Sequence, residues 1–368
     1  MKFIDLETQY NLIKREVKTG IDRVLDSGQY VMGPDVVDLE NQLSDFSNVK
    51  HTITCSSGTD ALLMALMALG VKSGDIVATT PFTYIATAEV ISLIGAIPMF
   101  IDIDYDTFNM NINALEEQLL KSDKSIKYVM PVNIFGAPLD YDHLYKLKEK
   151  FNFKIIEDAA QSFGAKYHQK VSGNLGDIGC TSFYPAKPLG CYGDGGAVFT
   201  NDDKIAEILK SIRVHGSGKD KYNNVRLGIN GRMDTIQAAV LIPKLKIFSD
   251  ELKRREDIAS KYTEILKNHF KTQKLLGNTK SSWAQYSILC NNKEHRDKVM
   301  NKLKNKNIPS VIYYAVPLHL QKVFCDLPKI CDRLPVVEDI CSRVVSLPMN
   351  PYLHEQEIIK VCDILLEA

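Results

Sequence analysis

The sequence has little that would assign it to a membrane, a nucleic acid or an oxidising compartment. Its 45 basic residues balance 45 acidic ones, so no net charge favours a polyanionic partner. The two most apolar stretches, 61–70 and 90–101, are too short to span a bilayer. Residues 1–7 carry charges where a secretory leader needs an apolar run. We therefore expect a cytoplasmic protein that binds neither membrane nor nucleic acid.

Cysteine is present but ungrouped, which argues against a metal site. None of the eight cysteines forms a Cys-x-x-Cys pair, so we expect no metal and reduced thiols. The length of 368 residues is large for one core. We predict a large domain over 1–247 and a small one over 248–368, with the N-terminal helix packed on the small domain.

From about residue 52, short β-type runs alternate with helical runs. The predicted strands are 52–55, 76–80, 97–101, 128–132, 154–158, 179–184 and 197–200. Strands separated by helices pair in parallel through right-handed crossovers, which predicts an α/β fold. A long helix is predicted over 233–246, interrupted or bent near Pro243 and continued by the charged segment 250–267. Shorter mixed elements follow.

Lys187 has the setting of a reactive lysine. Pro185 and Pro188 flank it, and four glycines follow between residues 190 and 196. An isolated lysine is nearly always a solvated surface residue. This loop, however, restricts the backbone and favours burial, which lowers a lysine pKa toward the neutral amine.

Asp158 closes the apolar strand 154–158. An acid at the carboxyl end of a parallel strand points into the crevice where open α/β sheets bind ligands. Without Lys187, a helix N-cap would be the more ordinary interpretation of Asp158. Together they fit pyridoxal phosphate (PLP): a lysine forms a Schiff base with the cofactor aldehyde, and a carboxylate pairs with the pyridinium nitrogen. We predict Lys187 and Asp158 as catalytic residues.

Three further segments offer cofactor contacts. The turn 57–59 joins a predicted strand to a helix, and N–H groups at a helix N-terminus attract phosphate, although many such turns are only caps. Ser182 is a second candidate phosphate ligand, and Gln161 a donor to the phenolic oxygen of the cofactor. Tyr84 is the candidate for stacking on the pyridine ring, whereas Phe82 fits a core aromatic equally well.

Taken together, the blocks resemble the DegT/DnrJ/StrS family of nucleotide-sugar aminotransferases, in the fold-type I, aspartate aminotransferase-like group of PLP enzymes. Matching blocks occur through most of the chain, at 3–6, 33–34, 57–62, 82–87, 157–161, 183–187, 213–216, 230–234 and 237–239. The resemblance implies a large domain with a mainly parallel seven-stranded sheet flanked by helices, plus a smaller α+β C-terminal domain. It also implies PLP as cofactor, with L-glutamate and a nucleotide sugar as substrates.

The resemblance assigns roles to individual residues. The cofactor contacts that it implies are Gly58, Thr59, Tyr84, Asp158, Gln161, Ser182, Lys187 and Asn230. Asn230 is expected to reach the phosphate of the neighbouring subunit's cofactor, which makes the active unit a homodimer with shared active sites. A tight turn before the long helix is an alternative reading of Asn230-Gly231, and both can hold.

The lysine loop favours one branch of the family. Where the family commonly has Thr-Lys-Asn, residues 186–188 are Ala-Lys-Pro, and the loop 187–196 resembles the branch that aminates C3 of UDP-linked 3-keto-N-acetylglucosaminuronic acid. That branch implies a role in O-antigen or lipopolysaccharide biosynthesis. Tyr313 instead replaces an expected histidine, and 319–321 resembles enzymes acting on dTDP-linked 3-keto-6-deoxyhexoses. Both substrates stay open, as does a non-catalytic regulator that binds PLP or sugar.

Substrate contacts are predicted on the same basis. The candidates are Arg232, Arg213, Tyr313, Tyr314 and His319. A planar guanidinium fork suits a carboxylate or diphosphate, although surface ion pairing is an equal alternative for both arginines.

Overall fold

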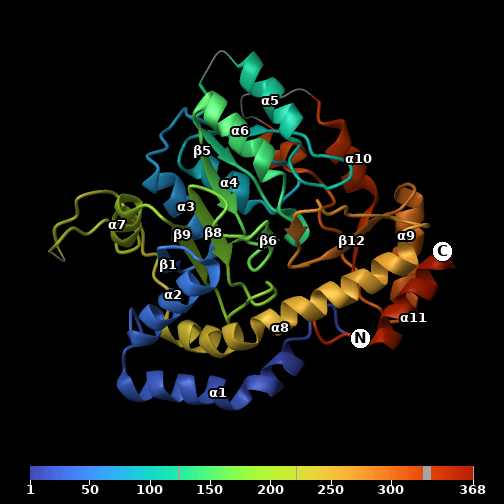
Figure 1. The fold of residues 1–368 in the computed structure, drawn as a ribbon, viewed down its shortest axis with the longest axis horizontal. Helices are drawn as coiled ribbons and strands as arrows, with labels where there is room; N and C mark the ends of the chain where they lie inside the picture. The colour runs from blue at the N-terminus through green and yellow to red at the C-terminus, as the bar shows by residue number, and fades with distance from the viewer. Residues whose placement is uncertain (123–124, 221, 326–332, 368) are drawn as a thin grey trace.

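The computed structural model describes residues 1–122, 125–220, 222–325 and 333–367. Its central sheet contains β1 (His51–Cys55), β2 (Ile76–Thr79), β3 (Ile97–Phe100), β4 (Tyr128–Met130), β5 (Lys154–Asp158), β8 (Ile178–Ser182) and β9 (Gly196–Thr200). The seven strands follow the order β1-β9-β8-β5-β4-β2-β3. β9 is antiparallel to both its neighbours, and the remaining pairs are parallel. The predicted mainly parallel α/β sheet is confirmed (Figure 1).

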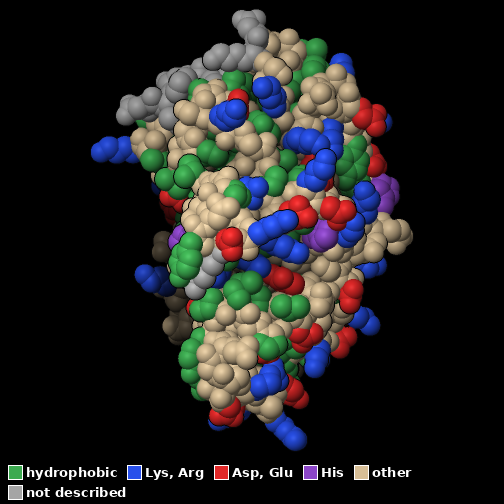
Figure 2. Space-filling view, turned by 90° about the vertical axis from the view of Figure 1, so that its left-hand side faces the viewer, with side chains coloured by type: hydrophobic (Ala, Val, Ile, Leu, Met, Phe, Trp, Pro, Cys, Tyr) green, Lys and Arg blue, Asp and Glu red, His purple; other side chains and the backbone are tan. Residues whose placement is uncertain are grey.

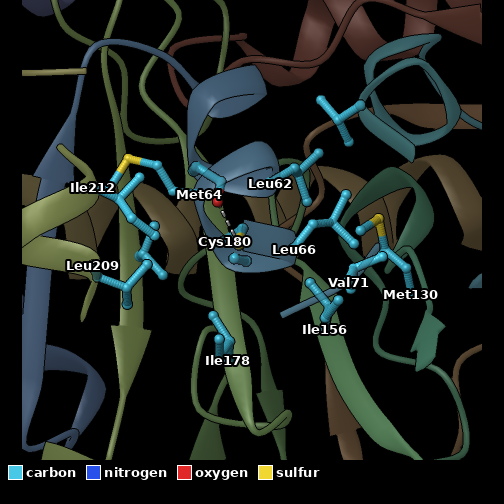
Figure 3. Packing of buried hydrophobic residues seen from close by; sticks show 14 of the residues in the cluster. Leu62, Met64, Leu66, Val71, Met130, Ile156, Ile178, Cys180, Leu209 and Ile212 are labelled. Atoms are coloured by element: carbon cyan, nitrogen blue, oxygen red, sulfur yellow. Dashed lines mark hydrogen bonds between the residues drawn. The ribbon is translucent and has the colours of Figure 1, made fainter. Parts of the chain in front are cut away.

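Helices bury both faces of this sheet. They are α2 (Pro34–Ser47), α3 (Gly58–Ala68), α4 (Ala86–Leu93), α5 (Ile112–Lys121), α6 (Tyr141–Phe151) and α7 (Asp203–Ile212). Leu62 and Leu66 of α3 face Ile156 and Ile178 of the sheet (Figure 3). The opposite face packs against α5 and α6 through a second apolar cluster. Because α3 is held by a dry core, the position of its N-terminus is fixed relative to the strands.

The long helix α8 (Thr235–Leu266) runs beneath the sheet and on toward the C-terminal part (Figure 1). Pro243 lies inside it and the helix continues past it, so of the predicted interruption or bend the interruption is wrong. Proline lacks the N–H that would bond the carbonyl of Ala239, four residues earlier. Gly20 of α1 (Leu6–Ser27) lies over that carbonyl, where a Cβ would be 3.1 Å from the oxygen. The absence of a side chain at Gly20 therefore lets α1 approach α8 closely where the proline leaves this oxygen free.

A smaller α+β part follows α8. It contains an antiparallel sheet of β10 (Lys271–Thr272), β12 (Tyr286–Leu289) and β13 (Val344–Leu347), with α9 (Lys293–Asn305), α10 (Pro335–Arg343) and α11 (Glu355–Leu366). A further sheet joins β6 (Lys166–Tyr167) and β7 (Lys170–Val171) to β11 (Thr279–Lys280). The predicted boundary at 247/248 falls inside α8, which belongs to both parts. The chain start lies beside this smaller part, since the N–H of Met349 donates to the carbonyl of Phe3 at 3.2 Å.

Short 3-10 turns complete the described chain: η1 (Ile134–Gly136), η2 (Leu318–Leu320) and η3 (Lys322–Phe324). Over the described ranges, no helix combines the length and apolarity needed to cross a membrane. The cysteines there are free thiols, and Cys331 lies outside the described residues. On the face drawn in Figure 2, cationic and anionic side chains are interspersed.

Gly179 provides a test of the packing around β5 and β8. A Cβ at this position would lie 2.1 Å from the carbonyl oxygen of Gly173, which is backbone and cannot rotate away. We predict that Gly179→Ala lowers the free energy of unfolding by about 3 kcal/mol, measured by urea denaturation. Gly277→Ala is the control because nothing lies within 4 Å of its Cβ, and it should change stability by less than about 0.5 kcal/mol. Equal stability of the two variants would contradict the packing described.

Candidate active site

The carboxyl edge of the central sheet brings the predicted residues together. Asp158 ends β5 and Ser182 ends β8, and these strands are parallel neighbours. Gly196, at the start of β9, pairs with both Ser182 and Cys55, the last residue of β1. The loop that carries Lys187 thus leaves and re-enters the sheet beside the turn that leads into α3.

The N-terminus of α3 forms a cradle with the end of β8. Ser57 caps the helix, its Oγ accepting from the N–H of Asp60 at 3.0 Å. A Cβ on Gly58 would lie 2.5 Å from the Cβ of Ser182, so only glycine fits. The first N–H groups of a helix have no intrahelical acceptor, which leaves those of Gly58 and Thr59 to face an anion. With the Ser182 hydroxyl beside them, they have the chemistry of a phosphate site.

Asp158 is buried, and its carboxylate is held by two donors. The hydroxyl of Thr87 donates to Oδ2 at 2.8 Å and the N–H of Ala160 to Oδ1 at 3.1 Å. Burial raises the pKa of Asp158, against the lowering effects of these bonds and of the Lys187 charge. Thr87 was not predicted as a site residue, although it stands in the 82–87 block. It holds the carboxylate in one orientation.

Lys187 lies at the tip of a tight loop, where its N–H donates to the carbonyl of Tyr184 at 2.8 Å. The residue keeps some exposed surface, yet its amine is deep enough that burial lowers its pKa. Asp158 opposes that shift through its charge, which places the two groups within electrostatic reach of one another. Burial thus shifts both groups toward their neutral forms while each charge opposes the shift of the other, and the catalytic roles of Lys187 and Asp158 stay predictions.

Gln161 links this pair to the C-terminal part of the chain. Its Nε2 donates to the hydroxyl of Tyr314 at 3.1 Å, and its Oε1 accepts from the N–H of Phe135 at 2.8 Å. Tyr314 packs edge-on against Phe82, with ring centroids 6.1 Å apart. Burial raises the pKa of Tyr314, and the nearby Asp158 charge raises it further. Phe82 is fully buried, as its alternative reading anticipated.

Tyrosines line the open side of the site. Tyr84 is 60% exposed and Tyr184 is 54% exposed, which leaves both rings available to a ligand. Tyr313 packs edge-on against Phe3 at 6.3 Å, and its pKa is raised by burial first and by the proximity of Tyr184 second. Tyr184 was not predicted as a site residue, although it immediately precedes Pro185 in the lysine loop.

Glu157 precedes Asp158 on β5 and was also not predicted as a residue that supports the site. Its carboxylate is fully buried and its pKa is raised by that burial. The donors to it are Asn133 Nδ2, Ser172 Oγ, and the N–H groups of Gly173 and Leu175. The N–H of Asn133 also donates to the carbonyl of Asp158 at 3.3 Å. This network fixes the end of β5.

Two candidate substrate residues are engaged elsewhere. Arg213 is buried, 2.5 Å from Glu40 and 2.9 Å from the carbonyl of Thr54, so its guanidinium ties α7 to β1 and α2. His319 lies 3.2 Å from Glu338 and tilts against Phe100. Neither has a contact with Lys187 or Asp158 in the described structure.

Asn230 and Arg232 lie on the surface near the start of α3. The carbonyl of Gly231, between them, accepts from the N–H of Ser56 at 3.1 Å. Arg232 Nη2 donates to Asn230 Oδ1, so these two side chains form one exposed polar group.

The raised pKa of Asp158 predicts a pH-dependent stability. A carboxyl whose folded pKa exceeds its unfolded value contributes stability at low pH that is lost as pH rises through the folded pKa. Without cofactor, Asp158→Asn should therefore gain stability relative to the parent as pH increases from about 4, the ordinary aspartate pKa, toward 8. Urea denaturation across this range measures the difference. A difference that stays constant with pH would show that Asp158 does not titrate as the buried group described.

Comparison with known proteins places this site in a family context. The model of the DegT/DnrJ/EryC1/StrS aminotransferase family matches residues 11–366. The chain is 44% identical to UDP-2-acetamido-2-deoxy-3-oxo-D-glucuronate aminotransferase of Pseudomonas aeruginosa, over 98% of each chain. It is 39% identical to a pleiotropic regulatory protein of Geobacillus stearothermophilus, over 96% of this chain and 94% of the relative.

A solved structure gives the same result for the fold. The crystal structure of a DegT DnrJ EryC1 StrS aminotransferase from Brucella abortus is 45% identical, with a TM-score of 0.96 and coverage of 100% of this chain and 99% of that one. Aminotransferases of this family depend on PLP. The sequence match and the fold agree: the chain belongs to the DegT/DnrJ/EryC1/StrS family of PLP-dependent sugar aminotransferases.

Proposed function

We propose that this cytoplasmic enzyme transfers the amino group of L-glutamate to the C3 ketone of UDP-2-acetamido-2-deoxy-3-oxo-glucuronate, for the synthesis of cell-surface polysaccharide. The observation that carries an aminotransferase site is the arrangement at the sheet edge, where Asp158 ends β5, Ser182 ends the neighbouring strand β8, and the loop after β8 carries Lys187. The substrate is supported by the Pseudomonas aeruginosa relative and by the form of the 187–196 loop.

The residues at the sheet edge fit PLP. Gly58 and Ser182 leave a cradle that any Cβ at 58 would fill, at a helix N-terminus suited to a phosphate. Lys187 supplies an amine with lowered pKa for the aldehyde, and Asp158 a carboxylate for the pyridine nitrogen. When bound, PLP supplies an electron-accepting ring that stabilises negative charge developing on the carbon next to the substrate nitrogen.

Lys187 is the proton carrier in this proposal. Because burial favours its neutral form, Nζ can accept a proton from a substrate carbon and return it to a neighbouring position. Asp158 stays oriented by Thr87 and Ala160, and a cationic partner beside it would favour its ionised form. Gln161 holds the Tyr314 hydroxyl in place by a hydrogen bond.

The tyrosines provide the binding surface. Tyr84 presents a ring face for stacking on the pyridine ring, while Tyr184 and Tyr313 contribute phenol groups at the mouth. Rings with one polar edge suit a sugar, which offers both apolar faces and hydroxyls. L-Glutamate and the sugar would use this space in succession, with the partly buried Arg232, which also bonds Asn230, as a cation for a carboxylate or diphosphate.

Removal of the Lys187 amine tests the proposed chemistry. Lys187→Ala should lower turnover by roughly a thousandfold or more, the cost of losing a group that transfers protons. The assay measures 2-oxoglutarate released from L-glutamate with the UDP-linked 3-keto uronate and with a dTDP-linked 3-keto-6-deoxyhexose. Lys246→Ala, an exposed position on α8, is the control and should retain the parent rate. Turnover of Lys187→Ala at the parent rate would refute the assignment.

The same assay separates the alternatives. Preference for the dTDP sugar would replace the proposed substrate with the second candidate. The 39% identity to a regulatory protein favours a regulator as the competing function. A parent protein that binds PLP and the sugars but transfers no amino group would support that function instead.

We propose further that the active unit is a homodimer in which Asn230 serves the partner's site. The loop after α7 extends away from the body of the molecule (Figure 1). It carries Val225 and Leu227, which are 54% and 88% exposed. Apolar side chains on a projecting loop favour burial against another surface. Asn230 ends this loop and is itself exposed.

Complementation between two defective subunits tests the shared site. Lys187→Ala and Asn230→Ala should each impair turnover. Mixing them by reversible dissociation should restore activity, because a mixed dimer then holds one site with both native residues. Half of the subunit pairings are mixed at equal concentrations, so activity should approach about a quarter of the parent's, with dimer assembly taken as unbiased. No recovery would place Asn230 in its own subunit's site, and a fully active Asn230→Ala would remove its role.

A further inference from the structure

Helix α8 contacts the lysine loop through two side chains that the proposed chemistry does not use. Lys244 is fully buried, and its Nζ donates to the carbonyl of Gly190 at 2.6 Å. The same nitrogen lies 4.2 Å from the centroid of the Tyr192 ring. Gln237 bonds both backbone groups of Tyr192: Oε1 accepts from its N–H at 2.9 Å, and Nε2 donates to its carbonyl at 3.3 Å.

Burial of the Lys244 amine removes the hydration of its charged form, which apolar packing does not replace. Among the described residues no carboxylate lies within ion-pair distance of its amine. Burial lowers the pKa of Lys244 to about 8, with Glu251 of the same helix and the Cys191 thiol opposing that shift. Glu251 itself is bound by Gln9 of α1 and by Tyr352. The Lys244 amine therefore interacts with one carbonyl, that of Gly190, and with one aromatic ring, that of Tyr192.

The bonded carbonyl belongs to a closed loop with Lys187 at its turn. The N–H of Cys191 donates to the carbonyl of Phe183 at 2.8 Å, which joins the two legs of the loop. A Cβ on Gly190 would lie 2.6 Å from the carbonyl oxygen of Pro185, so the legs are in close contact there. A displacement of the returning leg, 190–193, must therefore displace the leg that leads to Lys187.

Glycine in the returning leg leaves room for a side chain of α8. A Cβ on Gly193 would lie 2.8 Å from Nε2 of Gln237, so a larger residue would push the amide away. Tyr10 of α1 packs edge-on against Tyr192, with ring centroids 6.1 Å apart. Both long helices thus hold the same short segment, and neither Lys244 nor Gln237 contacts Lys187 directly.

We propose that Lys244 and Gln237 are positioning residues that set the depth of the Lys187 amine by fixing residues 190–193. The proposal rests on the role of Lys187 given above. A fixed returning leg keeps the amine away from water, and this burial favours its neutral form against the opposing charge of Asp158. Release of the leg would let the amine approach solvent and regain the basicity of an ordinary lysine.

Two measurements on the cofactor-free protein test this role. Hydrogen exchange of the 188–194 peptide, followed by mass spectrometry, reports how firmly the leg is held. Reductive methylation of Lys187 by formaldehyde and cyanoborohydride, mapped by peptide across a pH series, reports the pH at which the amine becomes reactive. The variants are Lys244→Met and Gln237→Leu, each close in size to the native side chain. Lys246→Met, exposed and two residues along α8, is the matched control.

Both variants should speed exchange of the 188–194 peptide by roughly tenfold, the effect of losing about one hydrogen bond. Both should move the methylation midpoint of Lys187 to higher pH, while Lys246→Met matches the parent.

A Lys244→Met protein that melts at a lower temperature but keeps the parent methylation midpoint would reduce Lys244 to a stabilising role and overturn the proposal. Gln237 is only partly buried, so Gln237→Leu decides the question if Lys244→Met does not fold. Parent-like exchange and midpoint in Gln237→Leu would overturn it as well. Neither readout needs turnover, so these results stand apart from those of Lys187→Ala.

Discussion

The attraction between Lys187 and Asp158 is the interaction on which the rest of the site depends. Each group is buried, so each loses hydration in its charged form, and each is shifted toward neutrality. Their mutual charge opposes both shifts. Such a pair is unfavourable for folding alone but well placed for a reaction that moves protons and needs a neutral amine. Stability given up at a functional site is a common feature of enzymes.

The fold maintains this pair through rigid backbone and satisfied polar groups. Glu157 of β5 accepts hydrogen bonds from Asn133 and Ser172, and Thr87 of α4 fixes the Asp158 carboxylate. Gly58 allows α3 to approach β8 closely, which makes the cradle a product of packing and not of loop flexibility. The same dry core that covers the sheet therefore sets the geometry of the cofactor site.

Sequence reasoning predicted the sheet and its site because both have local signals. Apolar runs bounded by turns identified the strands, and Asp158, Gln161 and Ser182 follow directly from strand ends. Partners that come from distant segments have no such signal. Thr87 reaches Asp158 across 71 positions in sequence and was not predicted as a site residue. Tyr314 was predicted as a substrate contact, but its bond to Gln161, 153 positions away, was not. Arg213 has the charge of a ligand-binding residue, yet Glu40, 173 positions away, already holds it.

Pro243 shows a second limit of prediction from sequence, which concerns the continuity of a helix. Proline in a helix interior predicts a break when the helix is considered alone. Here α8 is held on several sides, and Gly20 of α1 covers the carbonyl that lost its donor. Tertiary packing outweighed the local preference, and the uninterrupted helix carries Gln237 and Lys244 to the lysine loop.

The central claim is that one lysine carries the cofactor. The most direct measurement is borohydride reduction of the protein loaded with PLP, followed by peptide mapping. A pyridoxyl group on the peptide that contains Lys187, and on no other lysine peptide in stoichiometric amount, is the predicted result. A stoichiometric label on another lysine, or none on Lys187, would contradict the claim.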